Sequence, residues 1–430
     1  MALRAFVSSI SGTGVQGILA AGDDGFVAEG VTVASTDDVG ITASGSGHLI
    51  DVYGTVLGDF RAIFMGGSST TDFDNTLYVA ETGHLAGYDT GAFSVRLDGN
   101  RSTLINEGRI DGKKYAAIAI GGSDATTQST VENSGVIEGK TYAVFVNASE
   151  AFKLTNTGII KGGVSGGTGQ DVVLNNGTMI GDVNLEDGAD TFDTRGGSYT
   201  GVANGGLGAD KLYAGAGNNT LAGGEGNDVL AGGAGADSLD GGADTDSASY
   251  FYSSAGVTVS LTTPSANKGD AAGDTFISIE NISGSAFNDT LAGNSAANTI
   301  FGNSGNDVIK GYAGNDTLTG ASGKDTFLFH TALNAATNAD KITDFSAIDD
   351  TIQLENAIFT ALASTGTLSA DAFRANGTGL AADSTDRIVY ETDTGKLFYD
   401  RDGSGVSFDG VLFATLTNKP TITNADFIIV

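Results

Sequence analysis

Residues 205–249 read GGLGADKLY, AGAGNNTLA, GGEGNDVLA, GGAGADSLD and GGADTDSAS, which are five consecutive units of nine residues. Their shared template is G-G-x-G-x-D-x-U-x, where U is a large apolar residue. After an interruption, residues 284–328 return to this template as GSAFNDTLA, GNSAANTIF, GNSGNDVIK, GYAGNDTLT and GASGKDTFL. A short fixed period of this kind predicts a solenoid in which every unit contributes one turn and one strand.

The two parts of each unit have different roles. The first six residues are expected to form a turn, because their glycines adopt backbone angles that a Cβ atom would forbid. The last three residues are expected to form a short strand whose middle side chain points inward. These inward residues are Leu212, Leu221, Leu230, Leu239, Leu291, Ile300, Ile309, Leu318 and Phe327, while Ala248 is the small exception.

The turns carry a set of oxygen ligands that suits a hard cation such as Ca²⁺, namely carbonyl groups and the sixth-position side chain. Two units make one coil, so turns on the same side recur every 18 residues. The expected pairs are Asp210/Asp228, Asp228/Asp246, Asn219/Asp237, Asp289/Asp307, Asp307/Asp325 and Asn298/Asp316. The turn glycines assigned to these sites are Gly206, Gly208, Gly224, Gly226, Gly233, Gly235, Gly305 and Gly314. One ion in each pair gives about six Ca²⁺ ions, and the two sites with a neutral Asn are expected to be weaker.

These repeats resemble the hemolysin-type (RTX) calcium-binding repeats of proteins exported by type I secretion, including the C-terminal part of serralysin-type proteases. The resemblance implies a calcium-loaded parallel β-roll and a chain that folds after export. A glycine-rich linker with incidental aspartates is the alternative interpretation. Ten units in register, nine of them with a large apolar eighth residue, argue against that alternative.

The composition narrows the possible partners. The chain has 430 residues, with 66 Gly, 2 Pro and no Cys. The small number of prolines suits a solenoid, because Pro lacks the backbone N–H that donates a hydrogen bond to the neighbouring strand. The formal charge of −31 argues against nucleic acid or an anionic membrane surface as the main partner. No apolar run has the length of a membrane span, and the first residues lack the features of a cleaved signal peptide.

A longer and looser period lies upstream of the nonapeptides. A Gly-x-x-x-Gly signature recurs at Gly54/Gly58, Gly83/Gly87, Gly108/Gly112, Gly135/Gly139, Gly158/Gly162, Gly177/Gly181 and Gly197/Gly201. In four copies an Asn stands two places before the first glycine: Asn106, Asn133, Asn156 and Asn175. This pattern resembles the β-helical passenger domains of secreted adhesins. It predicts a parallel β-helix in which the four amides stack into a structural hydrogen-bond ladder.

The remaining segments complete the expected organisation. Residues 250–283 are expected to form a β-hairpin-like insert, in which Asp274 and Glu280 are solvated rather than calcium ligands. Residues 331–430 are expected to form a β-rich cap. The last five residues, an Asp followed by four apolar residues, resemble the uncleaved type I secretion signals of serralysin-like proteins.

Together these features predict an all-β protein in which a right-handed parallel β-helix runs into a calcium-binding parallel β-roll with a β-rich C-terminal cap. The expected domains are a β-helix at 1–200, roll blocks at 201–249 and 284–330, the insert at 250–283 and the cap at 331–430.

Evidence for catalysis is thin. The chain has three His and no HExxH motif, so the protease activity of serralysins does not carry over. Asp111/Lys113 and Glu138/Lys140 occupy matching places in two successive coils, where Lys could abstract a proton from an acidic polysaccharide. The same four charges could instead form an exposed ladder of ion pairs, and we favour this interpretation.

Two functions therefore remain open. The favoured one is a secreted, calcium-folded rod that acts as a structural or adhesive component of the cell surface or extracellular matrix. The alternative is a secreted polysaccharide lyase or glycanase with its site on the β-helix. Besides calcium, the expected partners are the type I secretion machinery and either extracellular polysaccharide or neighbouring copies of the chain.

Overall fold

The computed structural model describes residues 2–67, 73–88, 93–124, 126–147, 149–405 and 410–430. These residues form 46 β-strands, β1–β46, and four short 3-10 helices, η1–η4. They divide into two compact units: unit 1 holds residues 1–230 with 242–244, and unit 2 holds residues 231–241 with 245–430. The all-β fold class is therefore confirmed. The five expected domain boundaries stay predictions.

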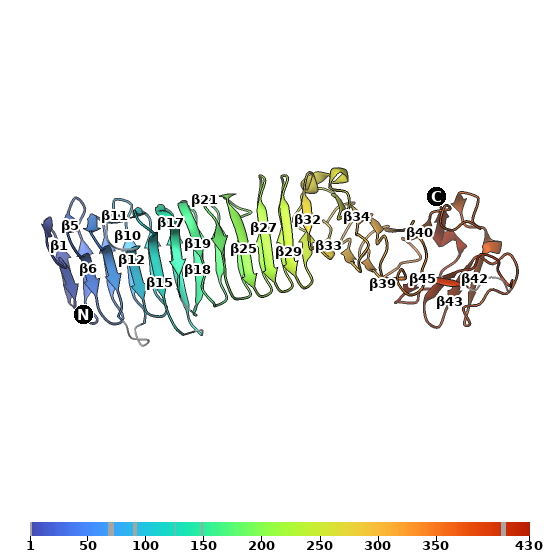
Figure 1. The fold of residues 1–430 in the computed structure, drawn as a ribbon, viewed down its shortest axis with the longest axis horizontal. Helices are drawn as coiled ribbons and strands as arrows, with labels where there is room; N and C mark the ends of the chain where they lie inside the picture. Colours follow the sequence, from blue (N-terminus) through green and yellow to red (C-terminus); the bar gives the residue numbers. More distant parts are fainter. Residues whose placement is uncertain (1, 68–72, 89–92, 125, 148, 406–409) are drawn as a thin grey trace. The chain divides into compact units, whose positions relative to one another are not determined.

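Unit 1 is built from parallel strands that recur in three columns, and Figure 1 shows its coils stacked in sequence order from blue to green. The first column is β1 (Leu3–Phe6), β4 (Asp24–Val27), β7 (Leu49–Val52), β10 (Thr76–Val79), β13 (Thr103–Asn106), β16 (Gln128–Asn133), β18 (Ala151–Asn156), β20 (Val172–Asn175), β23 (Thr191–Asp193) and β26 (Lys211–Tyr213). The second is β2 (Ile10–Gly12), β5 (Thr32–Ser35), β8 (Thr55–Gly58), β11 (His84–Gly87), β14 (Arg109–Gly112), β17 (Val136–Val146), β19 (Ile159–Ser165), β21 (Thr178–Ile180) and β24 (Ser198–Thr200). The third begins with β3 (Gly17–Leu19), β6 (Val39–Ala43), β9 (Arg61–Met65), β12 (Phe93–Asp98) and β15 (Ala116–Gly121). It continues through the later residues of β17 and β19 to β22 (Val183–Asn184), β25 (Val202–Leu207) and β27 (Thr220–Glu225). The strand β28 (Val229–Ala231) follows β27 in sequence.

The β-helix passes into the first nonapeptide coil without a change of register. Phe192 in β23 is aligned with Leu212 in β26, and Ala203 in β25 is aligned with Leu221 in β27. All four side chains are fully buried. Because apolar residues one coil apart stack on each other, the core of the β-helix continues into the repeats.

The expected asparagine ladder is confirmed. Asn106 donates to Asn133 (2.7 Å), Asn133 to Asn156 (2.6 Å) and Asn156 to Asn175 (2.7 Å), always from Nδ2 to Oδ1. Asn175 ends the ladder by donating to Thr194 Oγ1 at 2.8 Å. All four amides are buried, so each needs its neighbour to satisfy a polar group that water cannot reach.

Unit 2 continues the parallel pattern with two columns of short strands. One is β30 (Ser247–Ser249), β33 (Asn281–Ser283), β35 (Thr299–Phe301), β37 (Thr317–Thr319), β39 (Asp340–Ile342) and β45 (Val411–Leu416). The other is β31 (Thr258–Ser260), β34 (Thr290–Ala292), β36 (Val308–Lys310), β38 (Thr326–Phe329), β40 (Thr351–Leu354) and β46 (Phe427–Ile429). The nine large inward residues expected in the two repeat blocks are buried, with at most 1% of each exposed.

The expected hairpin in the insert is wrong. β31 pairs with β34, whereas β32 (Thr275–Ile277) pairs with β29 (Ser238–Ala243), so the two strands of the insert join different columns. The helices η1 (Pro264–Ala266) and η2 (Gly269–Ala271) lie in the segment that connects them. β32 thus stacks on the coil before it, whereas β31 is the first strand of the column on which the next coil stacks.

The cap is β-rich, as expected. Two of its strands extend the repeat columns, since β39 pairs with β37 and β40 pairs with β38. The rest comprises β41 (Gly366–Thr367), η3 (Ala370–Ala372), β42 (Phe373–Asn376), β43 (Ile388–Glu391), β44 (Lys396–Tyr399) and η4 (Asn424–Asp426). β43, β44 and β45 pair antiparallel in sequence order, and this change of direction ends the solenoid.

Candidate calcium sites in the repeat turns

The sixth-position side chains of successive turns stack into a column that we call the turn-end ladder. In it, the backbone N–H of one turn-end residue donates to the side-chain Oδ1 of the turn-end residue one coil further on. The bonds run from Asp210 to Asp228 (2.8 Å), Asp289 to Asp307 (2.8 Å), Asp307 to Asp325 (2.9 Å) and Asn298 to Asp316 (2.8 Å). These four expected pairs are therefore in contact. The pairs Asp228/Asp246 and Asn219/Asp237 stay predictions.

In four of the ladder aspartates, the second carboxylate oxygen lacks a hydrogen-bond partner among the described residues. Oδ2 of Asp210, Asp307, Asp316 and Asp325 is buried and accepts no hydrogen bond from any described residue. Each of these side chains is at most 1% exposed. Burying an ionised carboxylate without a partner costs several kcal/mol, roughly 2–7 even for a neutral polar group. The arrangement is therefore stable only when a proton or a cation neutralises the oxygen.

The first residue of these turns is glycine, and a side chain there would collide with Oδ2. A Cβ atom built on Gly302 would overlap Oδ2 of Asp307 and lie 2.7 Å from the carbonyl oxygen of Gly320, one coil further on. Gly205 is similar, since a Cβ atom there would overlap Oδ2 of Asp210 and lie 2.6 Å from the Gly223 carbonyl. Oδ2 and a carbonyl of the next coil therefore lie close to the same glycine, and both are oxygen ligands of the kind that Ca²⁺ accepts.

The turn glycines assigned from the sequence share one conformation. Gly206, Gly208, Gly224, Gly226, Gly233, Gly235, Gly305 and Gly314 all have φ between 85° and 153°. An L-residue is strained in this region, so the tight turn itself requires glycine at these positions. Their contribution of carbonyl ligands stays a prediction.

Burial also changes the acidity of the ladder. Desolvation, together with the charges of Asp289 and Asp325, raises the pKa of Asp307 to about 7. Desolvation likewise raises the pKa of Asp316 and of Asp325 to about 6. A cation that binds Oδ2 replaces the proton, so calcium binding and proton release are coupled.

The ladder contains residues that the sequence interpretation missed or rejected. The backbone N–H of Asp237 donates to Asp274 (2.8 Å) and that of Asp246 to Glu280 (2.9 Å), so the expectation that these two acids are solvated is wrong. Asp274 is fully buried and Glu280 is partly buried. In the cap, Asp340 accepts from Asp316 (3.1 Å) and Asp350 accepts from Asp325 (3.0 Å). The available signal was an Asp two places before an inward apolar residue, as in Asp340-Lys-Ile342, without the glycines of the full template.

The ladder differs from a side-chain metal cluster. In the described part of the chain, three or more His, Asp or Glu side chains nowhere gather as a metal-binding group. Each candidate site offers carboxylate oxygens and backbone carbonyls, which is the mixture that Ca²⁺ accepts.

Three of the four catalytic candidates lie in an ion-pair network. Asp111 is aligned with Glu138, and the Arg109 guanidinium bridges them at 2.6 Å and 2.8 Å. Lys113 Nζ lies 3.6 Å from the same Asp111, and His84 Nε2 lies 3.0 Å from it. Burial works to raise the pKa of Asp111, but Arg109 and His84 hold it below its ordinary value. Arg109 joins the two coils in this network, but Asp111 is buried, so this part differs from the exposed ladder expected from the sequence; the roles of the four residues stay predictions.

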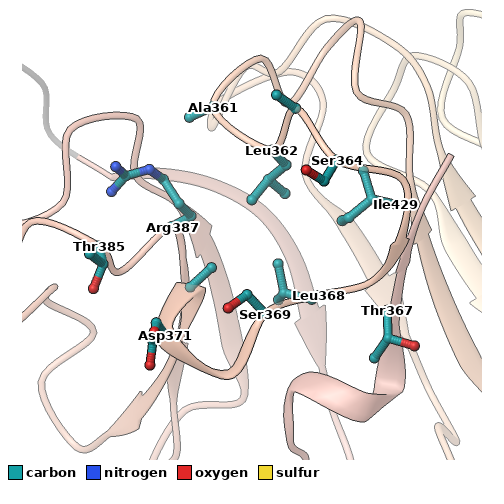
Figure 2. Close-up of a pocket in the computed structure, with 12 residues that line it drawn as sticks. Ala361, Leu362, Ser364, Thr367, Leu368, Ser369, Asp371, Thr385, Arg387 and Ile429 are labelled. Atoms are coloured by element: carbon teal, nitrogen blue, oxygen red, sulfur yellow. The ribbon is translucent and has the colours of Figure 1, made fainter.

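Lys140 has a different environment. It lines a groove of about 600 Å³ together with Tyr142, Asp182, Asn184 and Asn204. A second cavity of about 350 Å³ lies in the cap, where Figure 2 shows Leu362, Leu368 and Ile429 along its wall and Arg387 at its side. The Arg387 guanidinium donates to the carbonyls of Ser384 and Asp386, both at 2.9 Å, so it serves the local turn.

The parallel coils, the glycine turns and the buried carboxylate ladder define the class of calcium-binding parallel β-rolls. Comparison with known families is consistent with this class: residues 195–230, 213–248, 276–309 and 292–327 match the RTX calcium-binding nonapeptide repeat. The chain therefore carries RTX repeats and binds Ca²⁺ through them. A search of curated proteins finds no match to the chain. Among the described residues, no helix is long and apolar enough to cross a membrane.

A side chain at Gly302 should remove one ion. The backbone of Gly302 lies outside the left-handed region, so alanine is compatible with its backbone angles, but the added Cβ atom forces Oδ2 of Asp307 and the Gly320 carbonyl to move. We expect the variant to bind one Ca²⁺ fewer than the wild type in equilibrium dialysis, because the new methyl group occupies the space between Asp307 and the Gly320 carbonyl. Gly410→Ala is the control, since its Cβ would meet nothing closer than 3.4 Å. An unchanged ion count in Gly302→Ala would place the ion elsewhere.

Proposed function

We propose that the protein leaves the cell unfolded by type I secretion, folds when extracellular Ca²⁺ fills its repeat turns, and then acts as a structural or adhesive protein at the cell surface or in the extracellular matrix. The observation that carries this proposal is the series of buried turn-end oxygens without partners. Such a ladder makes the folded state dependent on a cation that is abundant outside cells and scarce inside them.

The charge of the repeat region supports the order of events. Residues 205–330 contain 14 acidic residues against four Lys and no Arg. Without a cation, this excess of like charge opposes close packing of the turns. Extracellular-type sites with dissociation constants of about 10⁻⁴–10⁻³ M fill only at millimolar calcium.

The C-terminal residues support the export route. β46 is parallel to β40, and Phe427 and Ile429 are buried against the end of the strand column. An uncleaved secretion signal stays in the folded protein, and burial of these apolar side chains in a strand is compatible with that role.

The experiment is expression of the full chain in a bacterial host with and without a type I exporter. We expect the protein in the medium only when the exporter is present, and resistant to protease there only when calcium is present. Retention in the cytoplasm beside a functional exporter would contradict the proposed route.

The same secreted protein tests the structural role against the enzymatic alternative. We expect it to release neither reducing ends nor unsaturated products from acidic exopolysaccharides. Release that is lost in both Lys113→Ala and Lys140→Ala would replace the structural role with a lyase or glycanase on the β-helix.

A further inference from the structure

The turn-end ladder begins upstream of the RTX match, inside the β-helix. The N–H of Asp171 donates to Oδ1 of Asp190 at 2.7 Å, and the N–H of Asp190 donates to Oδ1 of Asp210 at 2.7 Å. The bond from Asp210 to Asp228 inside the match has the same form and length (2.8 Å). The first matched residue is 195, so Asp171 and Asp190 lie outside the matched repeats.

The first coil has the partly exposed Asp23 in this position, which accepts from the N–H of Ala2 (2.9 Å), but later coils of the β-helix place neutral, buried side chains there. There, the N–H of His48 donates to Asn75 Oδ1 (3.1 Å) and the N–H of Ser102 donates to Ser129 Oγ (2.9 Å). An amide or a hydroxyl is therefore enough to satisfy the backbone of this fold. The change to carboxylates at Asp171 and Asp190 requires another reason.

The surroundings of Asp190 supply that reason. The side chain is 1% exposed, and its Oδ2 accepts no hydrogen bond from the residues that the structure describes. Its neighbours along the ladder are two more carboxylates, Asp171 and Asp210. A buried carboxylate between two others needs a positive partner at neutral pH.

The turn one coil before Asp190 begins with glycine, as the nonapeptides do. A Cβ atom on Gly166 would overlap Oδ2 of Asp171, which accepts from the N–H of Gly167 (2.9 Å), and would lie 2.6 Å from the Leu185 carbonyl, one coil further on. The corresponding atom on Gly205 meets Oδ2 of Asp210 and, at 2.6 Å, the Gly223 carbonyl. Residues 166–171 read GGTGQD, which is the turn half of the repeat template. In the next turn Glu186 takes the left-handed conformation (φ 68°) that glycine has at this place in the repeats.

We propose that the β-helix itself binds two Ca²⁺ ions, one between turns 166–171 and 185–190 and one between turns 185–190 and 205–210, with the Asp190 carboxylate shared by both. This inference rests on calcium binding by the repeats and extends it to coils outside them. The calcium-dependent part of unit 1 then starts near Asp171, two coils before the first nonapeptide.

The test is calcium stoichiometry of the full chain by equilibrium dialysis, with Asp190→Asn as the main variant. Asn keeps the size and the Oδ1 acceptor of the ladder but removes the charge, so we expect two fewer bound ions. Asp187→Asn is the matched control, because Asp187 is an exposed acid in the same turn, and its ion count should equal that of the wild type. An unchanged count in Asp190→Asn would overturn the proposal.

Thermal unfolding gives a second readout that a structural role would not produce. In chelator, Asp190→Asn should melt at a higher temperature than the wild type because it lacks the buried charge, and its calcium-induced increase in melting temperature should be smaller. A lower melting temperature in chelator would mean that Asp190 is a structural cap and not a ligand.

The variant Asp307→Asn distinguishes a failure of this inference from a failure of the proposed function. If Asp307→Asn lowers the ion count and Asp190→Asn does not, the repeats bind calcium and the β-helix does not. If the wild type binds no calcium, the proposed function fails as well.

Discussion

Removal of calcium is expected to unfold the repeat turns of residues 284–330. Without the cation, Oδ2 of Asp307, Asp316 and Asp325 remains buried and unpartnered. A ligand that binds only the folded state at 100 times its dissociation constant stabilises it by about 2.7 kcal/mol per site. Several such sites match or exceed the total stability of a typical domain, about 5–15 kcal/mol. Calcium should therefore decide whether this region is folded.

Hydrogen exchange followed by mass spectrometry measures the effect. At neutral pH we expect peptides that cover β34–β38 to lose their protection in chelator and to regain it at millimolar Ca²⁺. Mg²⁺ is the control: it requires short, nearly octahedral ligation and gives up its water reluctantly, so it should restore little protection. Equal protection of these peptides with and without chelator would show that folding does not depend on calcium.

Acid should partly replace calcium. The folded-state pKa values of Asp307 (about 7), Asp316 and Asp325 (about 6) lie above the ordinary value of 3.8. The folded form therefore binds more protons than the unfolded form between pH 4 and 7, and the stability of the calcium-free protein falls as pH rises through this window. Calcium-stripped protein should accordingly melt at a higher temperature at pH 5 than at pH 8. The calcium-loaded protein should show the opposite trend, because protons compete with the ion.

Asn133→Ala is expected to give the largest loss of stability among single substitutions in the β-helix. Asn133 accepts from Asn106 and donates to Asn156, and all three amides are buried. Each buried polar group left without a partner costs about 1–3 kcal/mol. Two such groups appear at once, so we expect a loss of about 3–5 kcal/mol, part of it from the cavity.

Denaturant unfolding in saturating calcium measures this loss, and hydrogen exchange locates it. Protection should fall first in β13, β16 and β18, because each coil of a solenoid contacts only its neighbours. Asn147→Ala is the matched control, since Asn147 is exposed and its loss should change stability by less than about 0.5 kcal/mol. A similar small loss in Asn133→Ala would mean that water or backbone groups satisfy the ladder.

The sequence by itself determined the parts of this protein that repeat. The nonapeptide period predicted the inward column from Leu212 to Phe327, because a solenoid places every residue of one phase in one environment. The recurring Asn predicted the amide ladder for the same reason. The pairs Asp289/Asp307 and Asp307/Asp325 followed from the number of residues in one coil.

Only the tertiary structure decided which residues outside the sequence repeats occupy positions in the turn-end ladder. The insert was expected to fold back on itself, but β32 pairs with β29 before it and β31 pairs with β34 after it, and Asp274 and Glu280 lie in the turn-end ladder. Asp171, Asp190, Asp340 and Asp350 join the same ladder although their turns match the template only in part. Stacking on the neighbouring coil fixes the position of each of these side chains. The spacing between coils is set by backbone hydrogen bonds between strands, and a local sequence motif does not predict these bonds.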